Sequence, residues 1–302
     1  MIYTITLNPA LDYIIAIEQI QLNEINTSQD EHILPGGKGI NVSIILKRLE
    51  VDSIALGFIS GFTGEEIKRL VETEKIKTDF INLKTGNSRI NVKILEEEKE
   101  TAINSKGPAV NNKSIEELYQ KLDIIKKDDI LVLSGSTPKG IDESIYEKIC
   151  EKIKEKNIKI VVDSTKNLLL NTLKYQPFLI KPNHHELGEI FNTEITNKDE
   201  ALEYAKILQQ NGARNVLVSM GSKGSVLLDE NGKTYKKDVI KNKNVINTVG
   251  AGDSMVAGFL AGYLKYQNYE EALKLGIASA TATVNDVFLG TKEKILEYFN
   301  SF

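Results

Sequence analysis

The sequence predicts an α/β protein with a mainly parallel central sheet and a second, smaller β-sheet. From about residue 113, short apolar runs of strand length alternate with helical patterns, which is typical of a parallel sheet covered by helices. Two stretches near 13–34 and 78–104 contain only short β-like runs, among them 80–83, with no room for helices between them. We assign these stretches to a small sheet that stands off a single domain spanning 1–302.

The composition argues against several classes of partner. The net charge is −4, with 38 basic and 42 acidic side chains, so no basic excess points to nucleic acid or to an anionic membrane surface. The single cysteine, Cys150, excludes an internal disulfide. The chain shows neither a signal-peptide pattern nor an apolar run long enough to span a bilayer. We therefore expect a cytoplasmic protein that acts on small molecules.

The stretch 247–259 is the strongest candidate for a reaction centre. Gly250 and Gly252 permit a tight turn that aims successive backbone N–H groups at one point, and the nearly uncharged pattern that follows predicts a buried helix. The free N-terminal amides of such a helix bind anions, phosphate above all. Asp253, in the first turn, then suits the removal of a proton beside the anion. In isolation, an Asp at this position is more often a helix cap.

Two loops early in the chain indicate a cleft for a hydroxyl-rich ligand. The first strand, 2–7, ends in the polar run Asn8–Asp12, which we interpret as a loop that leaves the sheet with an amide and a carboxylate. The second loop, Pro35–Gly39, opens a helix and carries Lys38, but it matches neither the P-loop nor the G-x-G-x-x-G pattern. Together, the backbone amides and side-chain oxygens of these loops suit a grip on hydroxyl groups.

Arg89 is a candidate phosphate ligand. Only four of the 38 basic side chains are arginines, so an arginine in a polar context carries more information here than in most chains. Arg89 and Asn91 point to the same side of a predicted strand, because alternate residues share a face. A guanidinium beside the expected cleft suits contact with phosphate, whereas the general expectation for an arginine is a place on the surface.

The carboxyl ends of the later strands gather polar residues along one rim of the predicted parallel sheet. Glu186 on this rim suits binding of Mg²⁺ through water molecules, and the Gly221–Gly224 loop suits a path under a nucleotide. His184 and His185 are adjacent and face different ways, which excludes the two-histidine metal pair of a helix. The rim residues are Asp163, Lys181, Asn183, Glu186 and 219–224.

These landmarks resemble the signatures of the ribokinase-like carbohydrate kinases of the phosphofructokinase B type. The segments Pro35–Val42 and Asn247–Ser254 match the two signatures, and the similarity spans essentially the full chain. The resemblance implies a ribokinase-like three-layer domain that binds ATP and Mg²⁺ along the sheet rim, with the small sheet as a lid over the sugar. Within the family, the chain is most similar to enzymes that phosphorylate fructose 1-phosphate, with tagatose-6-phosphate kinases as near neighbours. Further landmarks in matching order are Asn8–Asp12, Arg89–Asn91, Asn104, Gly107–Pro108, Ser134–Ser136, Lys181–Glu186 and Val218–Gly221.

The resemblance also implies a role for each matching position. Asp253 is expected to be the catalytic base, and the anion hole is expected at Gly250, Ala251 and Gly252. The residues expected to bind the phosphosugar are Asp12, Gly36, Gly37, Lys38, Asn41, Arg89 and Asn104. The residues expected at the nucleotide are Lys181, Asn183, Ser219, Gly221, Gly224 and Asn285, with Glu186 organising Mg²⁺.

Two positions depart from the pattern of this branch. Thr27 and Ile44 stand where arginines are usual, so Lys38 and Arg89 would carry more of the phosphate binding. In the family the lid often forms a dimer, and a small isolated sheet has too little core to be stable alone. We therefore expect a homodimer through the lid.

Two alternatives stay open beside a kinase for a ketohexose monophosphate. The first is a kinase for unphosphorylated sugars or nucleosides, which would give the charges of Lys38 and Arg89 nothing to bind. The second is a catalytically dead sugar or nucleotide sensor, which would not need Asp253 beside an intact glycine hole.

Overall fold

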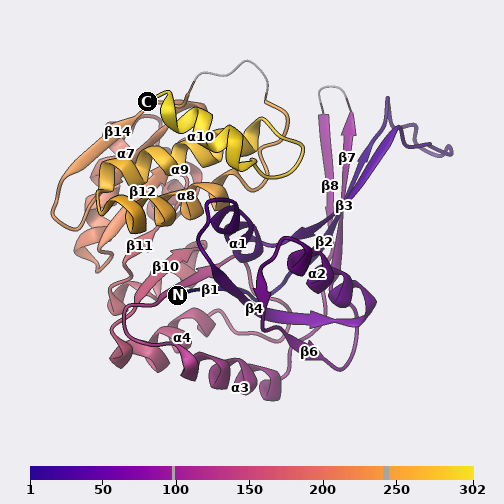
Figure 1. Cartoon of the computed structure of the whole chain (residues 1–302), viewed down its shortest axis with the longest axis horizontal. Helices are drawn as coiled ribbons and strands as arrows, with labels where there is room; N and C mark the ends of the chain where they lie inside the picture. Colours follow the sequence, from indigo (N-terminus) through magenta and orange to yellow (C-terminus); the bar gives the residue numbers. More distant parts are fainter. Residues whose placement is uncertain (97–98, 241–244) are drawn as a thin grey trace.

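A large, mainly parallel sheet runs through the computed structural model, which describes residues 1–96, 99–240 and 245–302 (Figure 1). The strands of this sheet are β1 (Ile2–Thr6), β4 (Ser53–Ser60), β5 (Lys77–Thr78), β6 (Ile81–Leu83), β9 (Ile130–Ser134), β10 (Lys159–Asp163), β11 (Leu179–Ile180), β12 (Asn215–Ser219), β13 (Ser225–Leu228) and β14 (Thr234–Lys237). Their order is β14-β13-β12-β11-β10-β9-β1-β4-β5, and β6 also pairs with β4. Only the pairs that involve β13 are antiparallel. The predicted parallel sheet is confirmed.

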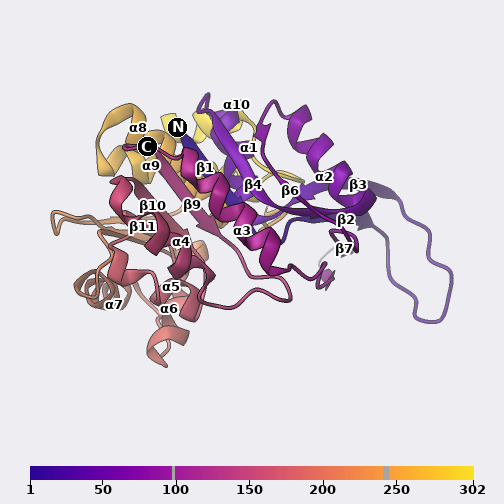
Figure 2. The same cartoon turned by 90° about the horizontal axis from the view of Figure 1, so that it is seen from below.

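Helices cover both faces of this sheet, which gives three layers (Figures 1 and 2). Along β9, Ile130 and Val132 belong to the core under the last helices, whereas Leu131 and Leu133 belong to the core on the opposite face. Within the described residues, no helix combines the length and the apolar character needed to cross a membrane. One face carries α1 (Lys38–Arg48), α2 (Gly61–Thr73), α8 (Ala251–Tyr266), α9 (Tyr269–Val284) and α10 (Lys292–Asn300). The other carries α3 (Asn112–Lys121), α4 (Ile145–Ile153), α5 (Lys166–Leu170), α6 (His184–Phe191) and α7 (Lys198–Gln210).

A separate four-stranded sheet projects from the main domain at one side (Figure 1). Its strands are β2 (Ala10–Ala16), β3 (Asp30–Gly36), β7 (Arg89–Glu96) and β8 (Lys99–Asn104), in the order β3-β2-β7-β8. The register pairs Asp12 with Asn91, and Asn91 with Asn104. Because alternate residues of a strand share a face, Arg89 and Lys93 lie on the same face as this row. Of the predicted stretch 78–104, residues 97–98 lie outside the described residues.

Two local interpretations of the sequence are wrong. The run Asn8–Asp12 is not one loop, because the chain returns to extended structure at residue 10 and Asp12 is paired with β3 on one side and β7 on the other. The segment 80–83 does not join the small sheet. It contributes β6, which pairs with β4 and buries Ile81 and Leu83 in the main core, where these apolar side chains remove more surface from water.

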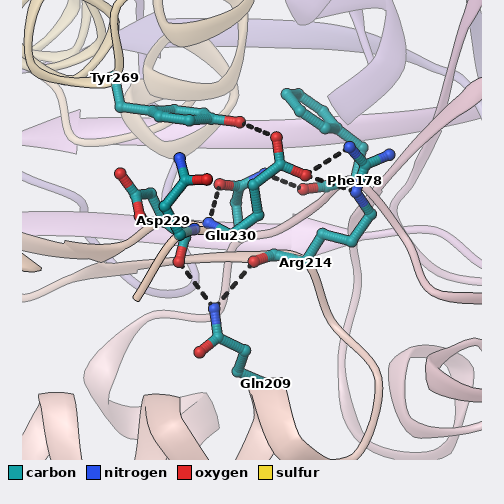
Figure 3. Close-up of polar contacts among 8 residues, drawn as sticks. Phe178, Gln209, Arg214, Asp229, Glu230 and Tyr269 are labelled. Carbon is teal, nitrogen blue, oxygen red and sulfur yellow. Dashed lines mark hydrogen bonds and ion pairs between the residues drawn. The ribbon is translucent and has the colours of Figure 1, made fainter. Parts of the chain in front are cut away.

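A polar network joins the antiparallel edge of the main sheet to α7 and α9 (Figure 3). The Gln209 amide on α7 donates hydrogen bonds to the backbone oxygens of Arg214, at 3.0 Å, and Asp229, at 2.8 Å. The Arg214 guanidinium pairs with Glu230, which also accepts a hydrogen bond from the Tyr269 hydroxyl at the start of α9. Because α9 packs along α8, this network helps to hold the helix that starts at the glycine loop.

Candidate active site

Helix α8 begins at the glycine loop that the sequence singles out. Gly250 precedes it with φ +80°, in the left-handed region that favours glycine, and a Cβ at this position would lie 2.7 Å from Cδ2 of Leu289. A Cβ on Gly252 would lie 3.1 Å from Nζ of Lys181. The first-turn amides of a helix have no intrahelical acceptor. An ammonium group and a helix N-terminus therefore meet at one point, and this combination favours a bound anion.

Asp253 lies in the first turn of α8, with 5% of its surface exposed. Asn41 Nδ2 donates a hydrogen bond of 2.8 Å to Oδ2 of Asp253. Burial raises the pKa of Asp253 to about 6; the negative charge of Asp163 adds to this shift, and Lys38, Asn41 and Lys181 oppose it. The carboxylate is therefore ionised at neutral pH and still basic enough to accept a proton.

Asp163, at the end of β10, is fully buried and links two lysines from other elements. Its Oδ1 lies 3.2 Å from Nζ of Lys38 at the start of α1 and 3.3 Å from Nζ of Lys181 after β11. Burial raises the pKa of Asp163, but the charges of Lys181 and Lys38 outweigh this and hold it below its usual value. The sequence puts Asp163 on the rim and gives it no role, because its partners lie in distant segments.

The same cluster keeps Lys38 charged. Burial lowers the pKa of Lys38, but the charges of Asp163, Asp253 and Glu186 outweigh this, so the net shift is upward. Lys38 therefore presents a permanent positive charge close to Asp253.

A cavity of about 270 Å³ opens between the rim of the main sheet and the small sheet. Lys38 and Arg89 are the cations of its lining, and hydroxyl groups from the ends of β1, β9 and β10 line much of the rest. Such a lining suits a ligand that is both anionic and rich in hydroxyl groups. The lining residues are Thr6, Asn8, Gly37, Lys38, Arg89, Ser134, Gly135, Ser136, Ser164, Thr165 and Glu186.

Gly36 and Asp12 meet where the small sheet joins α1. A Cβ on Gly36 would lie 2.6 Å from Cγ of Asp12, so only glycine leaves room for this carboxylate. Asn91 Nδ2 donates a hydrogen bond of 2.8 Å to Oδ1 of Asp12, and Nζ of Lys93 lies 3.3 Å from Oδ2. The sequence places Asn91 beside Arg89 but gives no signal for Lys93, because only the pairing of β7 with β2 brings Lys93 to Asp12.

The remaining residues expected at the sugar lie around this point. Arg89 Nε donates a hydrogen bond of 3.0 Å to the backbone oxygen of Asn8, and burial lowers the pKa of Arg89. Gly37 precedes α1 with φ +132°, and a Cβ there would lie 2.6 Å from Cγ2 of Thr6. Asn104 ends β8 and is exposed.

Asn183 and Glu186 cap the start of α6 reciprocally. The backbone N–H of Asn183 donates to Oε2 of Glu186 and the N–H of Glu186 donates to Oδ1 of Asn183, both at 2.8 Å. Asn183 also forms an isolated parallel bridge with Ser219 at the end of β12. At Gly224, φ is +88° and a Cβ would lie 2.1 Å from the backbone oxygen of Lys237, so the turn after β12 requires glycine.

Four further positions lie in other surroundings. Gly221 is exposed with φ +56°. Asn285, at the end of α9, donates from Nδ2 to the backbone oxygen of Thr281 at 2.8 Å, while its Oδ1 is buried with no partner in the described residues. Thr27 is exposed in the loop between β2 and β3. Ile44 is fully buried in the core on α1, so the chain uses this position for packing.

Direct contacts therefore divide the predicted residues into groups. The central group comprises Lys38, Asn41, Lys181, Gly252 and Asp253, with Gly250 and Ala251 at the adjoining helix start. Two further pairs lie outside the central group. Asp12 contacts Gly36 in the small sheet, and Asn183 contacts Glu186 on the rim of the main sheet. In the part of the chain that the structure describes, no hydrogen bond or ion pair joins the side chain of Asn285 to the central group.

A buried carboxylate beside a helix N-terminus and two lysines, on a three-layer α/β domain, is an arrangement that suits phosphoryl transfer. The family model for pfkB family carbohydrate kinases matches residues 5–293, so the chain belongs to this family. The expected resemblance and the ribokinase-like fold are confirmed.

Similar proteins support the same assignment. The chain is 46% identical to a 1-phosphofructokinase of Bacillus subtilis, over 97% of this chain and 95% of that protein. It is 38% identical to a tagatose-6-phosphate kinase of Staphylococcus epidermidis, over 91% and 89% of the two chains. Among solved structures, it is similar to phosphofructokinase-2 from Escherichia coli in complex with substrates and products, with a TM-score of 0.93, 27% identity and coverage of 99% and 98%.

We predict that Asp253→Asn stabilises the folded protein at neutral pH. Because burial raises the pKa of Asp253 to about 6, its ionisation costs more in the folded chain than in the unfolded chain. The cost is absent where the carboxyl is protonated in both states, grows as pH rises from the ordinary pKa of an Asp to about 6, and is complete above that pH. The gain at pH 7.5 should be on the order of 1–3 kcal/mol and should shrink at pH 4.5.

Urea unfolding of both proteins at the two pH values measures this difference. Glu117→Gln, on the exposed face of α3, removes the same charge as a control and should give no such pH dependence. A variant that is no more stable than the parent at pH 7.5 would contradict the prediction.

Proposed function

We propose that this pfkB-family kinase transfers the γ-phosphoryl group of ATP to the free primary hydroxyl of fructose 1-phosphate, forming fructose 1,6-bisphosphate and ADP in the cytoplasm. The observation that carries the proposal is the buried Asp253 beside the N-terminus of α8 and the two lysines that share Asp163. The identity of 46% to a protein named 1-phosphofructokinase supports the choice of sugar.

In this proposal Asp253 is the general base. It accepts the proton of the attacking hydroxyl as the sugar oxygen bonds to the γ-phosphorus and the bond to ADP breaks. Asn41 orients the carboxylate through the hydrogen bond to Oδ2. The amides from Gly250 to Gly252 and the ammonium group of Lys181 stabilise the negative charge of the transferred group.

The sugar phosphate is proposed to bind between the rim and the small sheet. Lys38 and Arg89, the two cations of the cavity lining, bind the phosphate group of the substrate. This pairing favours a phosphorylated sugar over a neutral one, because a neutral substrate offers no negative charge to Arg89 or to Lys38, whose only carboxylate partner within the described residues is the shared Asp163. The residues proposed to bind the sugar hydroxyls are Asp12, Gly36, Gly37, Asn41 and Asn104.

The nucleotide is proposed to lie along the rim with its phosphates toward Lys181. Glu186 lines the cavity and is held by its capping hydrogen bonds with Asn183, so it offers one oriented carboxylate. One or two carboxylates plus substrate phosphates are the donors that Mg²⁺ usually takes, so this arrangement fits the ion, which would neutralise phosphate charge when bound. The other residues proposed at the nucleotide are Ser219, Gly221, Gly224 and Asn285.

We predict that fructose 1-phosphate has the highest kcat/KM in a coupled assay of ADP release. The panel comprises fructose 1-phosphate, fructose 6-phosphate, tagatose 6-phosphate and free fructose, with ATP and Mg²⁺ held in excess. A higher kcat/KM for tagatose 6-phosphate would instead favour a tagatose-6-phosphate kinase, the name of the similar protein from Staphylococcus epidermidis. Binding of sugar phosphates without any ADP release would favour a sensor.

We predict that Asp253→Asn lowers kcat by at least about a hundredfold, since general-base catalysis typically contributes about 10² to 10⁴ in rate. Asn keeps the size of the side chain but cannot take the proton, so Kd for both substrates should stay nearly unchanged. In the parent, log kcat/KM for the sugar should fall as pH drops through about 6, because the base must be ionised. If the variant folds, binds both substrates and keeps most of the parent's kcat, Asp253 is a helix cap and not the general base.

The small sheet is also proposed as the interface of a homodimer. Ile33, Tyr13, Val92 and Ile103 pair in register across all four strands, on the face opposite Asp12. Ile33 is 51% exposed and Ile103 is 59% exposed. An apolar row on an exposed sheet face favours burial against a partner, and a second copy supplies the same self-complementary face.

We predict that the protein is a dimer in solution and that Ile103→Glu shifts it toward monomer. Light scattering at micromolar concentration measures the mass, which should be twice that of one chain for the parent. Ile207→Glu places the same charge on α7, at a side chain that is 39% exposed, and should leave the dimer intact. A parent protein that is monomeric and fully active at this concentration would contradict the proposed dimer through the small sheet.

A further inference from the structure

Lys93 is a buried lysine whose role no part of the proposed reaction explains. It lies on β7 with 8% of its surface exposed, whereas lysines are almost never buried unless they are paired. Its Nζ lies 3.3 Å from Oδ2 of Asp12, the carboxylate that pairs with this ammonium group. The cation is therefore committed to one residue of the proposed sugar site.

A second donor on the same strand holds the other oxygen of Asp12. Asn91 Nδ2 donates to Oδ1 at 2.8 Å, and Asn91 is itself 7% exposed. The register places Asn91 directly opposite Asp12, and Lys93 follows two residues later on the same face. Each carboxylate oxygen of Asp12 thus has one fixed donor on β7.

The backbone closes a second side of this carboxylate. A Cβ on Gly36 would lie 2.6 Å from Cγ of Asp12, so the carboxylate lies directly against the chain that leads into α1. With donors from β7 on one side and Gly36 on another, Asp12 has little freedom to rotate. Its remaining lone pairs point in a fixed direction.

The positions of the other cations separate Lys93 from phosphate binding. Lys38 and Arg89 are the basic residues of the cavity lining, whereas Lys93 and its partner Asp12 lie beside that lining rather than in it. Arg89 and Lys93 are four residues apart on one strand face, so the sheet carries one cation toward the cavity and one toward Asp12.

We propose that Lys93 and Asn91 are positioning residues that aim the Asp12 carboxylate at one sugar hydroxyl, and so set the discrimination between ketose stereoisomers. The inference rests on the proposed function, because it takes Asp12 as a sugar ligand. A carboxylate held in one orientation accepts a hydrogen bond from a sugar hydroxyl at one place. A stereoisomer with that hydroxyl elsewhere leaves this carboxylate oxygen without a hydrogen bond from the sugar.

The first test is the kinetics of Lys93→Met. We expect KM for fructose 1-phosphate to rise at least about tenfold, with kcat and KM for ATP changed less than about threefold, and the preference over tagatose 1-phosphate, its stereoisomer at C4, to shrink. Lys99→Met on β8 removes an exposed lysine from the same sheet and should leave all of these constants unchanged. An unchanged KM and unchanged preference would overturn the inference.

A double-mutant cycle then separates positioning from direct phosphate binding. If Lys93 acts through Asp12, Lys93→Met should change KM less than about twofold in an Asp12→Asn background. If the full effect persists in that background, Lys93 binds the substrate itself and the inference is wrong. Should Lys93→Met fail to fold, Asn91→Ala takes its place in the same cycle with the same two outcomes.

The parent enzyme keeps this test distinct from that of the proposed function. A parent that phosphorylates no ketohexose phosphate overturns the proposed function. An active parent with an unaffected Lys93→Met variant overturns only the role of Lys93.

Discussion

The ion cluster around Asp163 is the interaction on which the site depends. Two lysines from segments far apart in the sequence share one buried carboxylate oxygen, so α1, β10 and the chain after β11 are held at one point. Buried ion pairs contribute little net stability, because desolvation offsets most of their attraction. The cluster is better explained by what it does for its neighbour: it sets two positive charges beside Asp253 without leaving either of them unpaired.

The surroundings of this cluster contain polar groups that the folded chain leaves unsatisfied. Buried polar atoms in native proteins nearly always have partners, and exceptions concentrate where function requires them. Within the described residues, four such atoms line or adjoin the site: Asn41 Oδ1, Asn91 Oδ1, Ser134 Oγ and Asp163 Oδ2. They come from α1, β7, β9 and β10, so they reflect the design of the site rather than poor packing in one element. Three of the four atoms are acceptors, so a ligand rich in hydroxyl groups, which can donate hydrogen bonds, is the partner that such a set suits.

The sequence predicted the elements whose signals are local. The apolar runs of the parallel strands and the glycine loop before Asp253 needed no knowledge of distant segments. The interpretation of Asn8–Asp12 as a loop failed because a polar Asp within a strand looks like a strand end until its pairing on both sides is known. The sequence likewise does not predict the contact of Asp163 with Lys38 or that of Lys93 with Asp12, since these pairs are 125 and 81 residues apart. The register of sheets, which follows from packing, decides such contacts.

The two sheets are joined through a very short segment, and this explains how they act on one substrate. The strand β3 ends at Gly36 and α1 begins at Lys38, so a single residue separates the contact with Asp12 from the contact with Asp163. That residue, Gly37, has φ +132°, which side chains other than glycine rarely adopt. The contact between Asp12 and Gly36 therefore lies within two peptide bonds of the lysine beside Asp253. In the proposed reaction, a shift of the small sheet that moves Asp12 would reach that lysine through the backbone itself.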